Sequence, residues 1–63
     1  MIVGMTIRGV SPIEREPRDL DVYIKGEEAY IGIRVPDKER AEWAIWVPLS
    51  ELREVIARLR PVP

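Results

Sequence analysis

The side chains of this sequence that are best suited to bind a ligand are aromatic and cationic, and they fall at alternate positions of predicted β-strands. Aromatic rings offer stacking surfaces to nucleobases, and Arg and Lys side chains pair with phosphates. Successive residues of a strand point to opposite faces of a sheet, so alternate positions share one face. The candidate nucleic-acid-binding residues are Arg8, Tyr23, Lys25, Tyr30, Arg34 and Trp46.

Residue types that commonly carry catalysis are missing from the chain. The sequence contains no His and no Cys, which removes the usual general base, thiol nucleophile and soft-metal ligands. Asp19 and Asp21 fall on one strand face and could approach a divalent cation, but no third oxygen ligand occurs at a suitable spacing. Neither Ser11 nor Ser50 has a histidine or lysine near it in sequence to activate it. We therefore expect no catalytic residue, no metal site and no cofactor, and a protein that is not an enzyme.

The composition is that of one small folded domain comprising residues 1–63. Hydrophobic residues make up 46% of the chain and charged residues 33%, which is too apolar for a disordered chain. No uninterrupted apolar run approaches the length that a membrane span needs. The formal net charge is −1, whereas domains that bind nucleic acid are usually basic. The charge balance therefore counts against nucleic acid as the ligand.

The hydrophobic pattern predicts four strands followed by one helix. Two segments of alternating polarity flank Gly26 and Glu27, a two-residue turn typical of a β-hairpin. The fold class that follows is α+β, a four-stranded antiparallel sheet with one C-terminal helix packed on one face (ββββα). The predicted elements are strands at residues 1–9, 19–25, 28–35 and 42–47 and a helix at residues 49–60, whose apolar stripe is Leu49, Leu52, Val55, Ile56 and Leu59.

The two-residue turn also fixes which residues of the hairpin face one another. It places Tyr23 opposite Tyr30, and every pair then matches in character, whereas a slip by one residue would destroy the match. Trp43 and Trp46 cannot share one face of a regular strand, so Trp46 joins the two tyrosines if Trp43 joins the core. Ile13, in the connection after the first strand, is expected to fold down as a plug. The predicted core of the sheet is Val3, Met5, Ile7, Leu20, Val22, Ile24, Ile31 and Ile33.

A chain of 63 residues buries only a small core. Ordering it costs roughly 95 kcal/mol, and small domains offset such a cost with disulfides, metals or oligomerisation. Because Cys and His are both absent, we expect a homo-oligomer, a dimer or higher. The absence of Asn, Gln and Cys, with eight Arg against two Lys, is typical of a thermophilic protein. No secretion signal opens the sequence, so we expect a cytoplasmic protein without membrane association.

The element order and the tail segment AIWVPLSELREVIARL resemble two groups of single-stranded DNA-binding proteins. One is the positive-cofactor family of transcriptional coactivators, and the other is the small thermophilic archaeal group of ThermoDBP-related proteins, which the composition also fits. The resemblance covers residues 19–59 and implies an assembly of two or more copies that holds single strands on a curved basic and aromatic surface. This chain departs from the pattern because it is acidic overall, lacks an extended basic arm and carries two aspartates in its hairpin. Carried over to this sequence, the binding role falls to Tyr23, Lys25, Tyr30, Arg34 and Trp46.

Two functions of different classes therefore remain open. In the first, which we expect from the sequence, the chain is a non-catalytic single-stranded nucleic-acid-binding protein that uses an aromatic and basic sheet face. No residue pattern distinguishes DNA from RNA as its ligand. In the second, it is a structural or protein-interaction module whose aromatic sheet face is an oligomer or partner interface, because an exposed aromatic face is also typical of a dimer interface.

Overall fold

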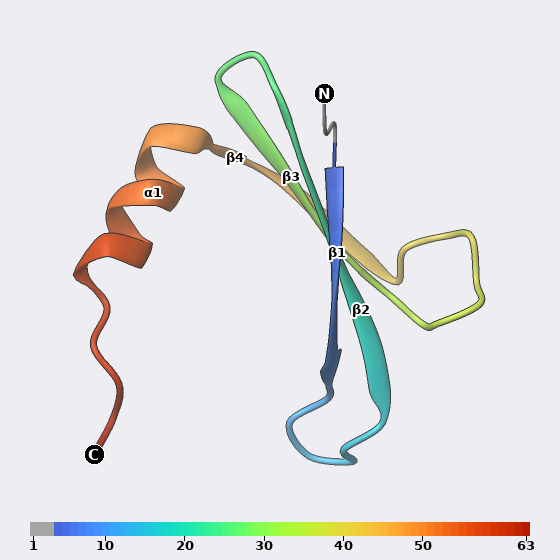
Figure 1. The fold of residues 1–63 in the computed structure, drawn as a ribbon. Helices are drawn as coiled ribbons and strands as arrows, with labels where there is room; N and C mark the ends of the chain where they lie inside the picture. The colour runs from blue at the N-terminus through green and yellow to red at the C-terminus, as the bar shows by residue number, and fades with distance from the viewer. Residues whose placement is uncertain (1–3) are drawn as a thin grey trace.

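The computed structural model describes residues 4–63, which form a four-stranded antiparallel sheet followed by one helix (Figure 1). The strands pair in chain order, so the first and the fourth strand are the edges of the sheet. The predicted α+β class and ββββα order are confirmed, while the predicted core residue Val3 lies outside the described residues. The elements are β1 (Gly4–Val10), β2 (Pro17–Lys25), β3 (Glu28–Arg34), β4 (Trp43–Pro48) and α1 (Leu49–Arg58).

The hairpin of β2 and β3 has the predicted turn and the predicted register. Gly26 has a φ of 62°, the left-handed conformation that a type II′ turn requires at its first central position. Tyr23 pairs with Tyr30 and Val22 with Ile31, so polar and apolar side chains separate onto opposite faces. The prediction of this hairpin is confirmed.

The loop between β1 and β2 is shorter than expected, because both strands extend further toward it. The loop closes on itself: the Ser11 amide donates to the carbonyl of Glu16 at 2.8 Å, and the Arg15 amide donates to the carbonyl of Ser11 at 3.1 Å. Ile13, within this loop, is 90% exposed. The prediction that Ile13 plugs the core is wrong, since a loop held by its own hydrogen bonds keeps that side chain away from the sheet.

The helix α1 follows β4 with no intervening loop residue. Pro48 occupies the N-cap position, and no side chain of residues 4–63 caps the helix. The backbone amide of Leu49 donates instead to the carbonyl of Glu27 in the β2–β3 turn, at 2.9 Å. This bond attaches the strand–helix junction to the turn and sets the direction in which the helix leaves the sheet. In the described part of the chain, no helix is long and apolar enough to cross a membrane.

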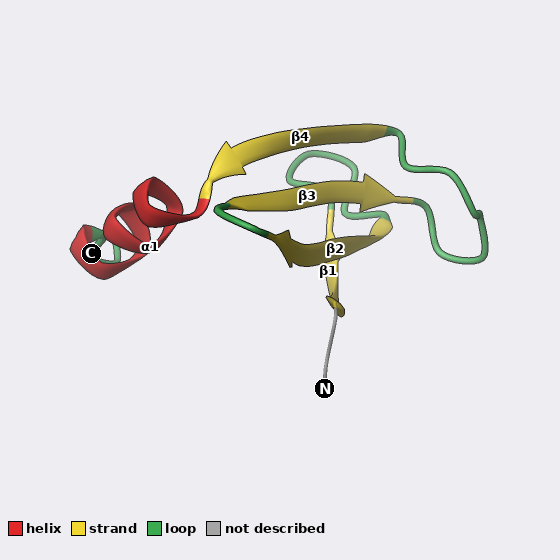
Figure 2. Ribbon diagram, turned by 90° about the horizontal axis from the view of Figure 1, so that it is seen from above, coloured by secondary structure: helices red, strands yellow, loops and turns green. Residues whose placement is uncertain are grey.

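The position of α1 differs from the prediction that the helix packs on one face of the sheet. The helix lies beyond the ends of β3 and β4 (Figure 2), which are the strands it mainly contacts. None of its residues is buried, and Val55, Ile56 and Leu59 are each more than half exposed. Because α1 continues directly from β4 and is held at its first residue, its axis leaves the strand end instead of turning back over the sheet.

The sheet therefore encloses little core. Among residues 4–63, Ala29 is the only hydrophobic residue that is buried. It pairs with Val47 in the row of the sheet next to the β4–α1 junction. The predicted core residues of β1, β2 and β3 lie together on one face, as expected, but that face is open.

Candidate interaction surfaces

The six predicted site residues all lie on one face of the sheet, which we call the polar face. The register places Trp46 beside the two tyrosines and Trp43 on the opposite face, as the spacing of the two tryptophans predicted. Residues that pair across neighbouring strands form rows that run across the sheet. Counted from the β2–β3 turn, the rows of the polar face include Lys25 and Glu28; Tyr23, Tyr30 and Trp46; Thr6, Asp21, Gly32 and Ala44; and Arg8, Asp19 and Arg34.

The three aromatic residues of the polar face form one packed cluster. Tyr23 and Tyr30 are stacked, with ring centroids 4.7 Å apart and an interplanar angle of 19°. Trp46 meets both rings edge-on, with a centroid distance of 5.6 Å to each. Such contacts stabilise a sheet by about 0.5–1.5 kcal/mol per pair. Trp46 remains 45% exposed, so its ring is the most accessible stacking surface of the cluster.

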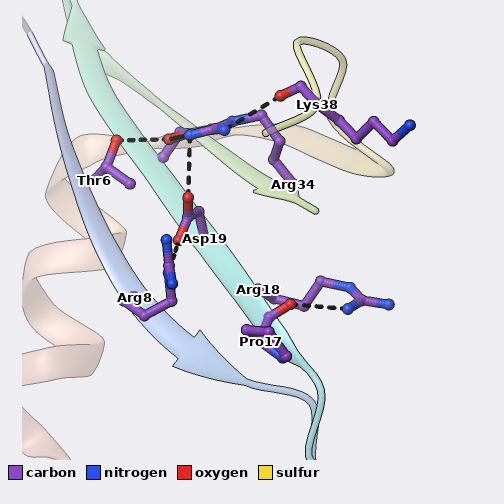
Figure 3. A network of polar contacts seen from close by, with 8 residues as sticks. Thr6, Arg8, Pro17, Arg18, Asp19, Arg34 and Lys38 are labelled. Atoms are coloured by element: carbon purple, nitrogen blue, oxygen red, sulfur yellow. Dashed lines mark hydrogen bonds and ion pairs between the residues drawn. The ribbon is translucent and has the colours of Figure 1, made fainter. Parts of the chain in front are cut away.

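The arginines of the polar face are bound by carboxylates of β2 (Figure 3). Arg34 makes a bidentate contact with Asp21, Nε to Oδ2 at 2.8 Å and Nη2 to Oδ1 at 3.0 Å. Its Nη2 also lies 3.5 Å from Oδ2 of Asp19, the residue directly opposite Arg34 in the register. Arg8 donates to the other oxygen of Asp19, and Thr6 donates to Asp21 at 2.7 Å. Asp19, the bridging residue, is only 7% exposed.

These contacts shift the ionisation of the groups that make them. The hydrogen bonds from Arg34, and secondly from Thr6, lower the pKa of the Asp21 carboxyl from its ordinary value of 3.8 to about 2. The hydrogen bond to Asp21 raises the pKa of Arg34. Both ions of the pair are therefore stabilised in the folded chain.

The same contacts determine the charge that the polar face presents. Asp19 and Asp21 balance Arg8 and Arg34, and Lys25 lies opposite Glu28. The register predicted from the two-residue turn placed Arg34 opposite Asp19 and Lys25 opposite Glu28, with the cations expected to contact phosphate and the aspartates expected to repel it. In the structure the aspartates and the arginines bind one another, so the face combines exposed aromatic edges with nearly balanced charge. In residues 4–63, no group of three or more His, Cys, Asp or Glu residues could hold a metal ion.

The opposite face of the sheet, which we call the apolar face, is also exposed, and the sequence pattern did not predict this. Met5, Ile7 and Trp43 are 64%, 59% and 71% exposed, although Met5 and Ile7 were expected to be covered by the helix. The register joins these residues and their neighbours into a continuous surface that spans all four strands. The apolar face consists of Met5, Ile7, Leu20, Val22, Ile24, Ala29, Ile31, Ile33, Trp43, Ile45 and Val47.

A cavity of about 470 Å³ lies at the end of the apolar face that is remote from α1. Its apolar walls include Ile7, Leu20 and Ile33. At its rim, Nε of Arg18 lies 2.9 Å from Oε1 of Glu42, and this hydrogen bond raises the pKa of Arg18. Neither of these charged residues stands out in the sequence, because 24 residues separate them and only the sheet register brings them together.

Comparisons of the chain with protein-family models, with curated proteins and with solved structures find no match.

Proposed function

We propose that this chain is a non-catalytic self-association domain whose apolar face is the interface with a second copy. The observation that carries the proposal is the burial of a single hydrophobic residue, Ala29, among residues 4–63. Burial of apolar surface is the main favourable term in folding, and one buried alanine does not offset the entropy of ordering the chain. A partner that covers the apolar face supplies the missing core.

The dimensions of the chain support an extensive interface. The accessible surface is 5782 Å², whereas a compact monomer of 7.3 kDa exposes about 4,200 Å². The radius of gyration is 13.0 Å, against about 11 Å for a compact domain of this length. The surplus surface is about 1,600 Å² for each chain, and covering it in a dimer would give an interface in the range of obligate dimers.

A second copy is the occupant that the surface favours. Obligate homodimer interfaces are the most apolar class and resemble a domain core divided in two. The apolar face shows that character, because it is hydrophobic across all four strands and its charged neighbours, Arg18 and Glu42, already pair with each other within the chain.

Two adjacent substitutions on the edge strand β4 test the proposal. Ile45→Glu places a carboxylate on the apolar face, and Ala44→Glu places the same charge one residue away on the polar face. We expect the first to abolish self-association and lower thermal stability, and the second to leave the assembled mass unchanged. Equal assembled masses for both variants, measured by light scattering, would contradict the proposal.

We propose single-stranded nucleic-acid binding on the polar face as a second function. The aromatic cluster favours it, since Trp46 is 45% exposed beside two stacked tyrosines and exposed rings can stack with bases. Lys25, exposed in the adjoining row, would contact a phosphate. The two proposed surfaces lie on opposite faces of the sheet, so the chain could use both at once.

We propose in addition that the protein is intracellular and comes from a thermophilic organism. The linked ion pairs of Arg8, Asp19, Arg34 and Asp21 support it, because networks of ion pairs contribute more to stability at high temperature than isolated pairs do.

A further inference from the structure

We propose that two copies exchange their helices, so that α1 of each copy lies across the apolar face of the other. This inference rests on the proposed self-association and specifies how the copies fit together. It follows from where α1 is held, from its length, and from which part of the apolar face is open.

The helix is held where it cannot cover most of its own sheet. No residue separates β4 from α1, and the amide of Leu49 is bonded to the turn residue Glu27 at 2.9 Å. Only Leu49 and Leu52 of the apolar stripe are partly buried. The other stripe residues, Val55, Ile56 and Leu59, are more than half exposed. The helix itself lies past the end of the sheet, where a partner can reach it (Figure 2).

The helix and the sheet match in size. The ten residues of α1 span about 15 Å along the helix axis. Four strands have three spacings between them, so the sheet is about 14 Å wide from β1 to β4. A helix laid across the strands would therefore contact every strand of the apolar face.

The open part of the apolar face lies where a symmetry-related helix would arrive. The row that contains Ala29 is next to the chain's own helix junction, whereas the rows that contain Met5 and Ile7 lie toward the other end of the strands. A two-fold axis perpendicular to the strands brings the partner's helix to that other end, and the contact then repeats identically in both directions. The 470 Å³ cavity lined by Ile7, Leu20 and Ile33 lies at this end and can receive apolar side chains of the partner helix.

The polar side of the helix fits the same arrangement. Glu54 and Arg58 form an ion pair at 3.0 Å away from the apolar stripe, and both side chains are well exposed. With Val55 and Ile56 turned toward the partner's sheet, this ion pair would remain in solvent. The exchange thus buries apolar side chains of both elements and leaves the Glu54–Arg58 ion pair of the helix in solvent.

Cross-linking between chains that each carry a single cysteine tests the exchange, because the natural sequence contains no cysteine. One chain carries Ile33→Cys on the apolar face, and an isotope-labelled chain carries Ile56→Cys on the helix stripe. The two are unfolded together, refolded as a mixture and treated with a short bifunctional thiol reagent. Ala57→Cys, on the opposite side of the helix, replaces Ile56→Cys as the control. Met5→Cys repeats the measurement at a second sheet position in case Ile33→Cys weakens folding.

The exchange predicts that sheet-to-helix cross-links exceed sheet-to-sheet and helix-to-helix cross-links by about tenfold, because only groups held in contact react at a raised effective concentration. The Ala57→Cys control should lose this preference. A dimer that yields mainly sheet-to-sheet cross-links would overturn the exchange and leave self-association standing. A folded monomer by sedimentation, with no cross-link between chains, would overturn the exchange and the proposed function together.

Discussion

The ring of Tyr30 lies over Gly32, two residues further along β3 on the same face. A Cβ atom built on Gly32 would come within 2.8 Å of the Tyr30 hydroxyl oxygen and 2.9 Å of its ring atom Cε1. No side chain fits at position 32 while the ring stays in place. The stacking of Tyr30 on Tyr23 at 4.7 Å therefore depends on a glycine in the neighbouring row.

Gly32→Ala should displace the Tyr30 ring from Tyr23. Removing glycine from a strand can stabilise the folded state by about 0.4–1 kcal/mol, while losing one aromatic pair costs about 0.5–1.5 kcal/mol. The two effects nearly cancel, so we expect little change in the free energy of unfolding. The expected signal is spectroscopic: the ring-current shifts of the Tyr23 and Tyr30 proton resonances should become smaller.

Gly9→Ala is the matched control for this substitution. Among the described residues, a Cβ built on Gly9 meets only the carbonyl oxygen of Arg18, at 3.8 Å, which is an ordinary contact. The tyrosine resonances should keep their positions in this variant. Unchanged tyrosine resonances in Gly32→Ala would show that the ring does not occupy the space over Gly32.

Gly26→Val should destabilise the β2–β3 hairpin. The φ of 62° at this position costs a residue with a Cβ atom about 1–2 kcal/mol, and a β-branched side chain at least that much. Gly26→Asn is the control, because asparagine tolerates the left-handed region. In denaturant unfolding, Gly26→Val should lose more stability than Gly26→Asn. Equal stabilities would mean that the turn does not require a positive φ.

The Asp21–Arg34 pair should make stability depend on pH in the acid range. The pKa of Asp21 is lowered to about 2 in the folded chain, so the unfolded chain takes up the proton first as the pH falls. The stabilisation is complete above about pH 4 and is lost as the pH falls to about 2. Because the pair is partly exposed to solvent and screened by it, we expect its contribution to stability to be small.

Thermal unfolding of the wild type and of Asp21→Asn over this pH range checks the acid dependence. The wild type should be the more stable at neutral pH, and the two melting temperatures should converge toward about pH 2. A difference that stays constant from neutral to acid pH would show that the carboxylate charge of Asp21 does not stabilise the fold.

The proposed nucleic-acid site predicts two separable effects on single-strand binding. Tyr30→Ala should weaken binding by about 1–3 kcal/mol through lost stacking. Lys25→Ala should lower the slope of log K against log salt by about 0.7, the value for one phosphate contact on a single strand. Lys38→Ala removes the same charge from the β3–β4 loop and should leave the slope unchanged. Titrating the tryptophan fluorescence with a single-stranded oligonucleotide at low and high salt measures both effects, and an absence of salt-sensitive quenching in the wild type would exclude this site.

The elements that local patterns determine were predictable from the sequence. The two-residue turn at Gly26 fixed the β2–β3 register, and the spacing of Trp43 and Trp46 fixed which tryptophan joins the tyrosines. The position of the helix was not predictable in this way. Helical periodicity places Val55 and Ile56 on the apolar side of the helix, but it does not show which surface that side packs against. That surface depends on how the junction at Leu49 is held.

The sequence predicted which residues share the polar face, but it did not predict all of the ion pairs that balance their charges. The sequence placed Arg34 opposite Asp19, and the register confirms this pairing. The strongest contact of Arg34 nevertheless goes diagonally to Asp21, while Asp19 also binds Arg8 of the neighbouring strand. The contact with Arg8 depends on the β1–β2 register, which a loop without a two-residue turn does not specify.

Sedimentation equilibrium of the unmodified chain at low micromolar concentration, with circular dichroism on the same samples, distinguishes a self-associated protein from a stable monomer. Self-association through the apolar face predicts a folded species of at least twice the 7.3 kDa chain mass, and a melting temperature that rises with protein concentration. A cooperatively folded species of 7.3 kDa, with a melting temperature independent of concentration, would show that the chain folds without a partner and that the apolar face is not an obligate interface.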